Sequence, residues 1–338
     1  MLAILLVPYN GGQYHLGEAG LDDTSDILHA DTLFSALTNI YAMAFSGADR
    51  FVNMVDEGKL RFSSCFYALL TPDKPVFFLP KPPVQYAGSC DMKLLKKIRY
   101  LSSGAWNVML KSFDSTSLRT EFDPLGIPTL GSDFVYLENE LPGMERLLEK
   151  KFFRSITTVP KVKVHTTEQE DRLYHETCIQ FSSISCGGCI LKGAFYFFIE
   201  HELNEEEWKE FFGALRILAD EGVGGQRTSG KGQFEKVEIV DVDLPAAQNA
   251  KWRMGLSPVS PADDREFHDA LHYYDLFVRG GGSLGLVGNS EAHRRQARFV
   301  KEGALLRQKM KGCLVDVSPG RDRSVLRYGI NFSIPLGA

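Results

Sequence analysis

The chain has 338 residues, of which 44% are hydrophobic and 24% are charged, a balance typical of a globular protein with two domains and a sizeable core. Its formal net charge of −5 excludes an argument for nucleic-acid binding from overall charge, so any such binding needs a local basic surface. No run of about 18 apolar residues is present, and residues 1–9 lack the basic start of a signal peptide, so the sequence predicts no membrane-spanning helix and favours the cytoplasm.

The first half of the chain is predicted to begin with a buried strand over 1–9, followed by a Gly-containing loop. A helix then begins near His29, with Asp31 as its N-cap and an apolar face that starts at Leu33. Further strands are predicted over 60–70 and 76–79.

Residues 84–150 have a weaker pattern and are interpreted as an insertion. A short basic helix is predicted over 91–100, and a loop-rich stretch over 102–135. The segment 151–163, which is basic with interleaved aromatic residues, is taken as the junction between two domains.

The second half is predicted to begin with two strands of a hairpin, over 172–181 and 190–199. A helix over 204–220 follows, because Asn204 and Glu207 have the spacing of a capping box before an apolar face of helical period. Strands are then predicted from 234 to 240 and over 273–278, 298–306, 313–317 and 325–334.

The order strand–helix–strand–strand–helix–strand in each half predicts an α+β fold of two ferredoxin-like (RRM-like) domains. The first domain is expected over 1–155, with the insertion at about 84–150, and the second over 156–338. This fold is shared by modules that hold single-stranded RNA, although fold alone does not determine function.

The stretch 222–232, with the sequence GVGGQRTSGKG, carries the most chemistry in the chain. Its glycines allow positive φ angles and a close approach of the backbone to a ligand. Backbone N–H groups, the hydroxyl of Ser229 and the cations Arg227 and Lys231 can together bind phosphate oxygens. The loop is therefore predicted to contact a phosphate-bearing ligand.

Two other interpretations of this loop are weighed. Gly225–Lys231 spells most of a Walker A motif, but a P-loop follows a strand and begins a helix, whereas here the order is reversed. Gly232 also stands where a Walker motif has the Ser or Thr that binds magnesium. A simple mobile surface loop is the other alternative, and the two cations in the loop argue against it.

The cysteines are scattered and do not form a disulfide pattern. His175, Cys178, Cys186 and Cys189 have a spacing that is superficially similar to that of a zinc site. His175 and Cys178 should face opposite sides of a strand, and Cys186–Cys189 is typical of a turn, so no metal site is predicted.

These features together resemble the RAMP superfamily of CRISPR proteins, whose signature is a Gly-rich loop between a helix and a strand of a ferredoxin-like unit. The segment His29-x-Asp31-x-Leu33-Phe34-Ser35-Ala36-Leu37 is similar to one member group, the fourth subunit of the type III-A Csm effector complex. The segments 300–304 (VKEGA) and 327–329 (RYG) are similar to the same group.

The resemblance implies a structural RNA-binding subunit of a CRISPR ribonucleoprotein that acts in antiviral defence and is not an enzyme. Such a subunit holds the repeat-derived 5′ tag of the CRISPR RNA (crRNA), anchors the large polymerase-like subunit and contacts the backbone RAMP subunit. It implies no catalytic residue, no metal, no cofactor and no membrane contact. The residues expected to bind RNA are Gly222, Gly224, Gly225, Arg227, Ser229, Gly230, Lys231, Gly232, His29, Asp31, Lys161, Lys163 and His165.

The alternative from another functional class is a metal-independent endoribonuclease of the same superfamily that processes crRNA. Metal-free RNA cleavage requires a side chain that moves protons at the 2′-hydroxyl and at the leaving oxygen. His15 and His29 are the candidates for that role. An NTPase would instead require nucleotide hydrolysis that is lost in Lys231→Ala.

Overall fold

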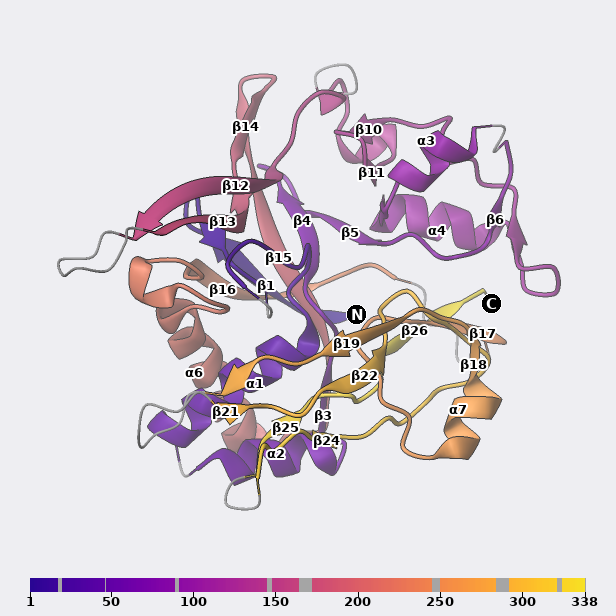
Figure 1. Cartoon of the computed structure of the whole chain (residues 1–338). Coiled ribbons are helices and arrows are strands. Elements are labelled where there is room, and N and C mark those ends of the chain that lie inside the picture. The colour runs from indigo at the N-terminus through magenta and orange to yellow at the C-terminus, as the bar shows by residue number, and fades with distance from the viewer. Residues whose placement is uncertain are drawn as a thin grey trace.

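The computed structural model describes residues 1–17, 20–45, 47–88, 91–144, 148–163, 172–244, 250–283, 292–320 and 324–337. Within these residues the fold is α+β, as predicted, with six α-helices and several sheets (Figure 1). The helices are α1 (Ala30–Ala44), α2 (Ala48–Asp56), α3 (Met92–Lys97), α4 (Ser103–Lys111), α6 (Glu205–Glu221) and α7 (Asp264–Ala270). No described helix combines the length and the apolar character needed to cross a membrane.

The largest sheet organises the molecule. Among the described residues it has the strand order β10-β11-β7-β5-β4-β15-β1-β16, with β3 and β14 also paired to β15. Its strands are β1 (Leu2–Pro8), β3 (Leu60–Phe62), β4 (Phe66–Leu70), β5 (Val76–Pro80), β7 (Tyr100–Ser102), β10 (Thr129–Leu130), β11 (Phe134–Val135), β14 (Ser183–Cys186), β15 (Cys189–His201) and β16 (Phe234–Asp241). The central strand β1 is apolar along most of its length because both of its faces are buried.

Four neighbouring strands of this sheet, β4-β15-β1-β16, form an antiparallel unit with two helices. Helix α1 lies between β1 and β4 in the chain, α6 lies between β15 and β16, and the two helices pack together. The unit therefore has the order strand–helix–strand–strand–helix–strand. Its strands come from both sides of the boundary expected at 155/156, and the division into two ferredoxin-like domains stays a prediction.

The capping box predicted at the start of α6 is confirmed. The side chain of Asn204 accepts a hydrogen bond from the Glu207 N–H at 2.9 Å, and the Glu207 carboxylate accepts one from the Asn204 N–H at 2.9 Å. The start of α1 differs from the prediction, because the N-cap is His29 and the helix begins at Ala30. Asp31 therefore lies inside the first turn, and its carboxylate is used elsewhere.

The inserted region lies at the upper right of Figure 1 and is more regular than predicted. The basic helix expected over 91–100 is present as α3, with Asp91 as its N-cap. The stretch 102–135, predicted to be loop-rich, contains the helix α4. Ser102 is the N-cap of this helix, and its hydroxyl accepts a hydrogen bond from the Ala105 N–H. A small sheet completes the region with β6 (Gln85–Tyr86), β8 (Phe113–Asp114) and β9 (Arg119–Thr120).

A long two-stranded arm projects from the body at the left of Figure 1. It consists of β12 (Arg154–Lys163) and β13 (Arg172–Phe181), and β13 also pairs with β2 (Gln13–Tyr14). The predicted hairpin between 172–181 and 190–199 is therefore wrong. The hairpin partner of β15 is the short strand β14, because Gly187 and Gly188 form a two-residue turn with positive φ angles between them.

The C-terminal region packs below the insertion in Figure 1 and contributes part of the core. Its predicted strands are present but shorter and more broken than expected. Three strands, β17, β20 and β21, were not predicted. The strands of the region are β17 (Trp252–Gly255), β18 (Leu271–Tyr273), β19 (Leu276–Arg279), β20 (Gly282–Ser283), β21 (Ala292–His293), β22 (Ala297–Val300), β23 (Leu305–Leu306), β24 (Val315–Asp316), β25 (Leu326–Arg327) and β26 (Ser333–Leu336).

Candidate RNA-binding site

The Gly-rich loop 222–232 leads from α6 into β16, so the predicted order helix–loop–strand is confirmed. This order is the reverse of a P-loop. The loop begins at Gly222, whose N–H donates to the Leu218 carbonyl at 2.8 Å and ends the helix. It then runs beside the segment that contains β2. The N–H of Gly225 donates to the His15 carbonyl at 2.8 Å, and that of Gly232 donates to the Gln13 carbonyl at 2.9 Å.

Several of the glycines are required by the packing of the loop itself. Gly224 has φ +80°, and a Cβ atom there would lie 2.3 Å from the backbone oxygen of His15. Gly232 has φ +85°, and a Cβ atom there would lie 2.2 Å from the backbone oxygen of Val223. Gly230 also has a positive φ, of +78°, but nothing lies within 4 Å of its Cβ position. The loop is thus bound tightly to its neighbours at both ends and open near its tip.

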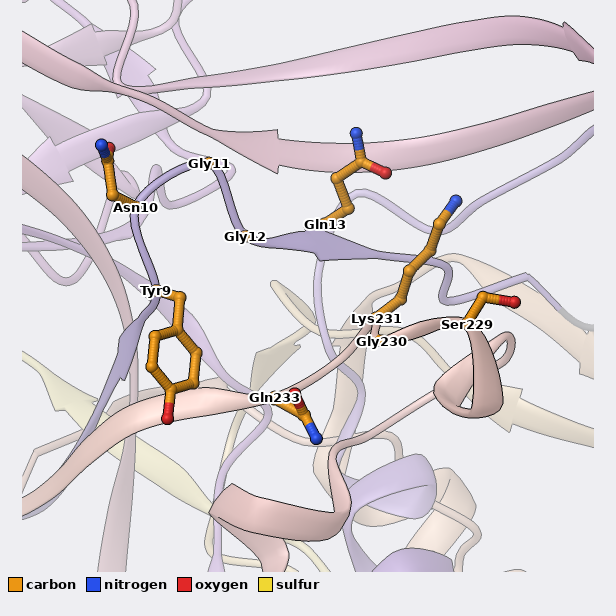
Figure 2. Close-up of a pocket in the computed structure, with 9 residues that line it drawn as sticks. All are labelled: Tyr9, Asn10, Gly11, Gly12, Gln13, Ser229, Gly230, Lys231 and Gln233. Atoms are coloured by element: carbon orange, nitrogen blue, oxygen red, sulfur yellow. The ribbon is translucent and has the colours of Figure 1, made fainter.

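An open hollow of about 390 Å³ lies between the tip of the Gly-rich loop and the turn that follows β1 (Figure 2). Its walls are formed by Tyr9, Asn10, Gly11, Gly12, Gln13, Ser229, Gly230, Lys231 and Gln233. Ser229 and Gly230 were predicted from the sequence. The segment 9–13 was missed, although the pair of glycines directly after an apolar strand was a signal for a tight turn there.

Arg227 and Ser229 lie in a short 3₁₀ turn (η2, Arg227–Ser229) and are both exposed. The guanidinium of Arg227 lies 4.0 Å from the exposed carboxylate of Glu221. An exposed ion pair at this distance contributes little, about 0–1 kcal/mol, so a ligand phosphate can compete for the guanidinium. The Ser229 hydroxyl donates to the side chain of Gln226 at 3.2 Å.

Lys231, also predicted from the sequence, lines the hollow but has a protein partner. Its ammonium turns toward β13 and lies 2.5 Å from the carboxylate of Glu176, and it donates to the Cys178 sulfur at 3.2 Å. The Lys231 side chain is only 10% exposed and that of Glu176 only 2%. Lys161, from β12, forms a second ion pair with the same carboxylate and is 40% exposed. Lys231 lines the hollow, but its ammonium is held by a buried carboxylate that it shares with Lys161.

Glu176 was not predicted as part of this region. Burial alone would raise the pKa of its carboxyl group, but hydrogen bonds and charge from Lys161 and Lys231 outweigh burial and lower it. The same contact raises the pKa of Lys161. Lys163 is the last residue of β12, opposite Arg172, and its side chain lies outside the described residues, as does the whole of His165.

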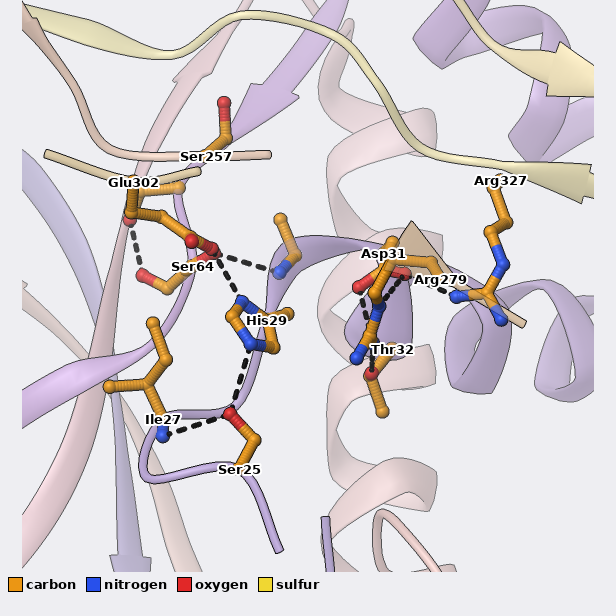
Figure 3. A network of polar contacts seen from close by, with 12 residues as sticks. Ser25, Ile27, His29, Asp31, Thr32, Ser64, Ser257, Arg279, Glu302 and Arg327 are labelled. Carbon is orange, nitrogen blue, oxygen red and sulfur yellow. Dashed lines mark hydrogen bonds and ion pairs between the residues drawn. The ribbon is translucent and has the colours of Figure 1, made fainter. Parts of the chain in front are cut away.

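His29 and Asp31 are buried where α1 begins (Figure 3). The His29 ring contacts the Glu302 carboxylate through Nδ1 at 2.7 Å and the Ser25 hydroxyl through Nε2 at 2.9 Å. The Ser64 hydroxyl donates to the same carboxylate oxygen. The structure does not bring His29 to the Gly-rich loop, and any contact of this ring with RNA stays a prediction.

Asp31 accepts a bidentate pair of hydrogen bonds from Arg279, at 2.8 and 2.9 Å, and a further one from Arg327. Burial by itself would raise the pKa of this carboxyl group, but the charges of the two arginines overcome burial and lower it to about 2. Asp31 therefore joins α1 to the C-terminal region, and its expected contact with RNA is also untested.

His15, a candidate base for RNA cleavage, is 4% exposed, and its Nδ1 lies 2.9 Å from the carbonyl oxygen of Thr177. His175 is exposed and Cys178 is buried, so the two residues face opposite sides of β13 as predicted. Among the residues that the structure describes, no three His, Cys, Asp or Glu side chains are arranged to hold a metal ion.

Residues 248–336 match the family described as the CRISPR Csm4 C-terminal domain. A Csm4 protein from Methanocaldococcus jannaschii is 26% identical over an alignment that covers 95% of this chain and 90% of the relative. The predicted resemblance to the fourth Csm subunit is confirmed. A Csm4 protein from Streptococcus thermophilus is 24% identical and covers 90% of this chain and 89% of the relative.

Chains from solved Csm complexes share the fold. A chain from a Csm3-Csm4 subcomplex of the type III-A CRISPR-Cas interference complex aligns with a TM-score of 0.67 and 22% identity, over 99% of both chains. A chain from a Csm1-Csm4 cassette in complex with cA4 aligns with a TM-score of 0.55 and 19% identity, over 99% of this chain and 97% of the other. With the Csm4 relatives, these similarities support a subunit of a type III CRISPR effector.

Proposed function

We propose that this chain is an RNA-binding structural subunit of a type III-A CRISPR effector complex and holds the 5′ tag of the crRNA. The observation that carries the proposal is the hollow between the Gly-rich loop and the turn after β1, in a chain that is similar to Csm4 over almost its whole length. The hollow is bordered by backbone and by small polar groups, which can fix a sugar–phosphate strand without reading its sequence.

Arg227 is the cation of this loop that is best placed to meet a phosphate. It is exposed, and its protein partner is an exposed carboxylate at 4.0 Å. Lys231, by contrast, is only 10% exposed and is paired with buried Glu176, which Lys161 shares. Arg227 should therefore supply the salt-dependent part of the affinity that this loop contributes.

The partners of the subunit are part of the proposal. Chains with a similar fold come from a Csm3-Csm4 subcomplex and from a Csm1-Csm4 cassette. By analogy, the chain contacts a backbone RAMP subunit and anchors the large polymerase-like subunit. Co-expression of the three subunits, followed by size-exclusion chromatography, tests this: the chain should elute with each of the other two.

We also propose that the role is binding and not catalysis. The histidines considered for RNA cleavage, His15 and His29, are 4% and 5% exposed and contact protein groups through their ring nitrogens. A repeat RNA incubated with the purified protein without metal should remain intact. Specific cleavage that is lost in His29→Ala or in His15→Ala would contradict the proposal.

The RNA site is tested by titrating salt against the binding of a labelled single-stranded RNA that begins with the repeat-derived tag. Arg227→Ala should weaken binding and make the slope of log K against log salt shallower by about 0.7, the value for one phosphate contact on a single strand. Arg216→Ala, which removes an exposed arginine from α6, is the matched control and should change neither quantity. Unchanged affinity and slope in Arg227→Ala would refute the site.

A further inference from the structure

The inserted region and the C-terminal region enclose a second hollow, of about 450 Å³, which the proposed tag site does not use. Its wall includes Lys81 directly after β5, Lys96 and Arg99 from the insertion, and Tyr273, Tyr274 and Glu302 from the C-terminal region. The volume is in the range of small-ligand sites in proteins. We propose that this hollow binds one nucleotide of a single-stranded RNA, and so gives the insertion a direct role in RNA binding. The proposal deepens, and rests on, the proposed RNA-binding function.

The wall of the hollow carries the cations Lys81, Lys96 and Arg99 and the carboxylates Asp275 and Glu302, so its formal charge is slightly positive; Arg99 also pairs with Asp26. Helix α3, which borders it, places Lys93, Lys96 and Lys97 on its exposed side, in a chain with a formal net charge of −5. Such a local excess of positive charge is the feature that RNA binding requires in an acidic protein. Burial lowers the pKa of Lys81 to about 8, and a phosphate beside its ammonium would offset that effect.

Two adjacent tyrosines provide a surface on which a base can stack. Tyr273 is 55% exposed although it belongs to strand β18. Tyr274 is held by an edge contact with Phe267, with ring centroids 5.9 Å apart. Exposed aromatic rings beside cations are the elements with which proteins bind single-stranded nucleic acids without sequence preference.

Glu302 borders the hollow, but its side chain is only 3% exposed. One oxygen of its carboxylate, Oε1, accepts from Ser64 and contacts His29 (Figure 3), whereas the other, Oε2, is buried and has no partner among the described residues. A buried acceptor of this kind requires a donor. That donor is not a ligand in the hollow, because the atom has almost no accessible surface, and the Glu302 carboxylate instead fixes the wall through Ser64 and His29.

The test uses the full-length chain and the same labelled tag RNA as above. Tyr273→Leu keeps an apolar side chain but removes the stacking ring, and should weaken binding about tenfold, while Tyr273→Phe should bind as wild type. Lys96→Ala should make the salt slope shallower by about 0.7. Lys209→Ala removes another exposed helix lysine, on α6, and is expected to change nothing.

The results separate the two sites. If the Tyr273 and Lys96 variants bind like wild type while Arg227→Ala binds weakly, the nucleotide site is refuted and the tag site stands. If none of these variants changes affinity or slope, both proposals fail. If the Tyr273 and Lys96 variants keep RNA affinity but no longer co-elute with the large or the backbone subunit, the hollow is a protein contact and the inference is wrong.

Discussion

Asp31 is predicted to be a main electrostatic link between helix α1 and the C-terminal region. Its carboxylate is completely buried, and its partners Arg279 and Arg327 are 6% and 5% exposed. Removing one member of a buried ion pair costs about 3–5 kcal/mol, because the remaining charge keeps its desolvation penalty without its partner. Asp31→Ala should therefore lower the free energy of unfolding by about that amount.

The dependence on pH provides a second measure of the same link. The pKa of Asp31 falls from 3.8 to about 2 on folding, and at about 1.4 kcal/mol for each unit this is worth about 2.5 kcal/mol. Because the folded-state pKa is depressed, this stability is fully present above pH 3.8 and is lost as the pH falls toward about 2. The difference in unfolding free energy between wild type and Asp31→Asn should shrink through that window.

Urea unfolding at pH 6 measures the first effect, and a series at lower pH measures the second. Asp73→Asn makes the same chemical change at an exposed loop carboxylate and should stay within about 0.5 kcal/mol of wild type. Asp31→Ala should also expose the C-terminal region to limited proteolysis before the rest of the chain. A loss of less than about 1 kcal/mol in Asp31→Ala would refute the reasoning, since it lies well below the cost of a broken buried pair.

Two further predictions concern the Gly-rich loop. Gly224→Ala should destabilise the protein by about 3 kcal/mol, because the alanine would have a positive φ and its Cβ would overlap the His15 backbone. Gly230→Ala has a similar φ but no neighbour at the Cβ position, and should cost about 1 kcal/mol. Equal losses of unfolding free energy in the two variants, measured by thermal or urea unfolding, would contradict this. Lys231→Ala should lower the unfolding free energy by about 2 kcal/mol by removing one cation from buried Glu176, and should leave the salt slope of RNA binding unchanged. Lys209→Ala, at an exposed site, is the control, and a shallower slope in Lys231→Ala would show that this lysine meets phosphate after all.

The local elements were predictable because their signals lie within a few residues of one another. The capping box at Asn204 and Glu207, the apolar strand β1 and the helix–loop–strand order around 222–232 are all of this kind. The turn Cys186–Cys189 was also predicted, but the pairing of β15, which follows this turn, with β14 was not. Pairing partners are chosen by the whole sheet, and nothing within 172–199 shows that β13 is taken by β12.

The role of individual polar residues was less predictable, because it depends on distant partners. Asp31 is a residue type that is common at N-caps and lies close to the start of a helix. Its carboxylate nevertheless binds Arg279 and Arg327, which lie 248 and 296 residues further along the chain. Glu176 gave no local signal at all, and yet it decides how two of the predicted RNA-binding lysines are used. Sequence pattern identified the loop, whereas long-range pairing determined the environment of its charges.

The number of cations in the Gly-rich loop overstates how much the loop contributes to the salt-dependent affinity for RNA. Binding of a phosphate gains free energy from the counterions that it releases, and a cation already neutralised by a buried carboxylate has few counterions to release. Lys231 is paired with such a carboxylate and is 10% exposed, so the excess positive charge of its cluster lies on the more exposed Lys161, whereas Arg227 faces an exposed carboxylate at 4.0 Å. The ion pair with Glu176 instead joins the loop to the β12–β13 arm, so Lys231 lines the hollow, while Arg227 is the exposed cation of the same loop and lies outside the lining of the hollow. A salt slope close to that of one contact at this loop, and not of two, is the consequence.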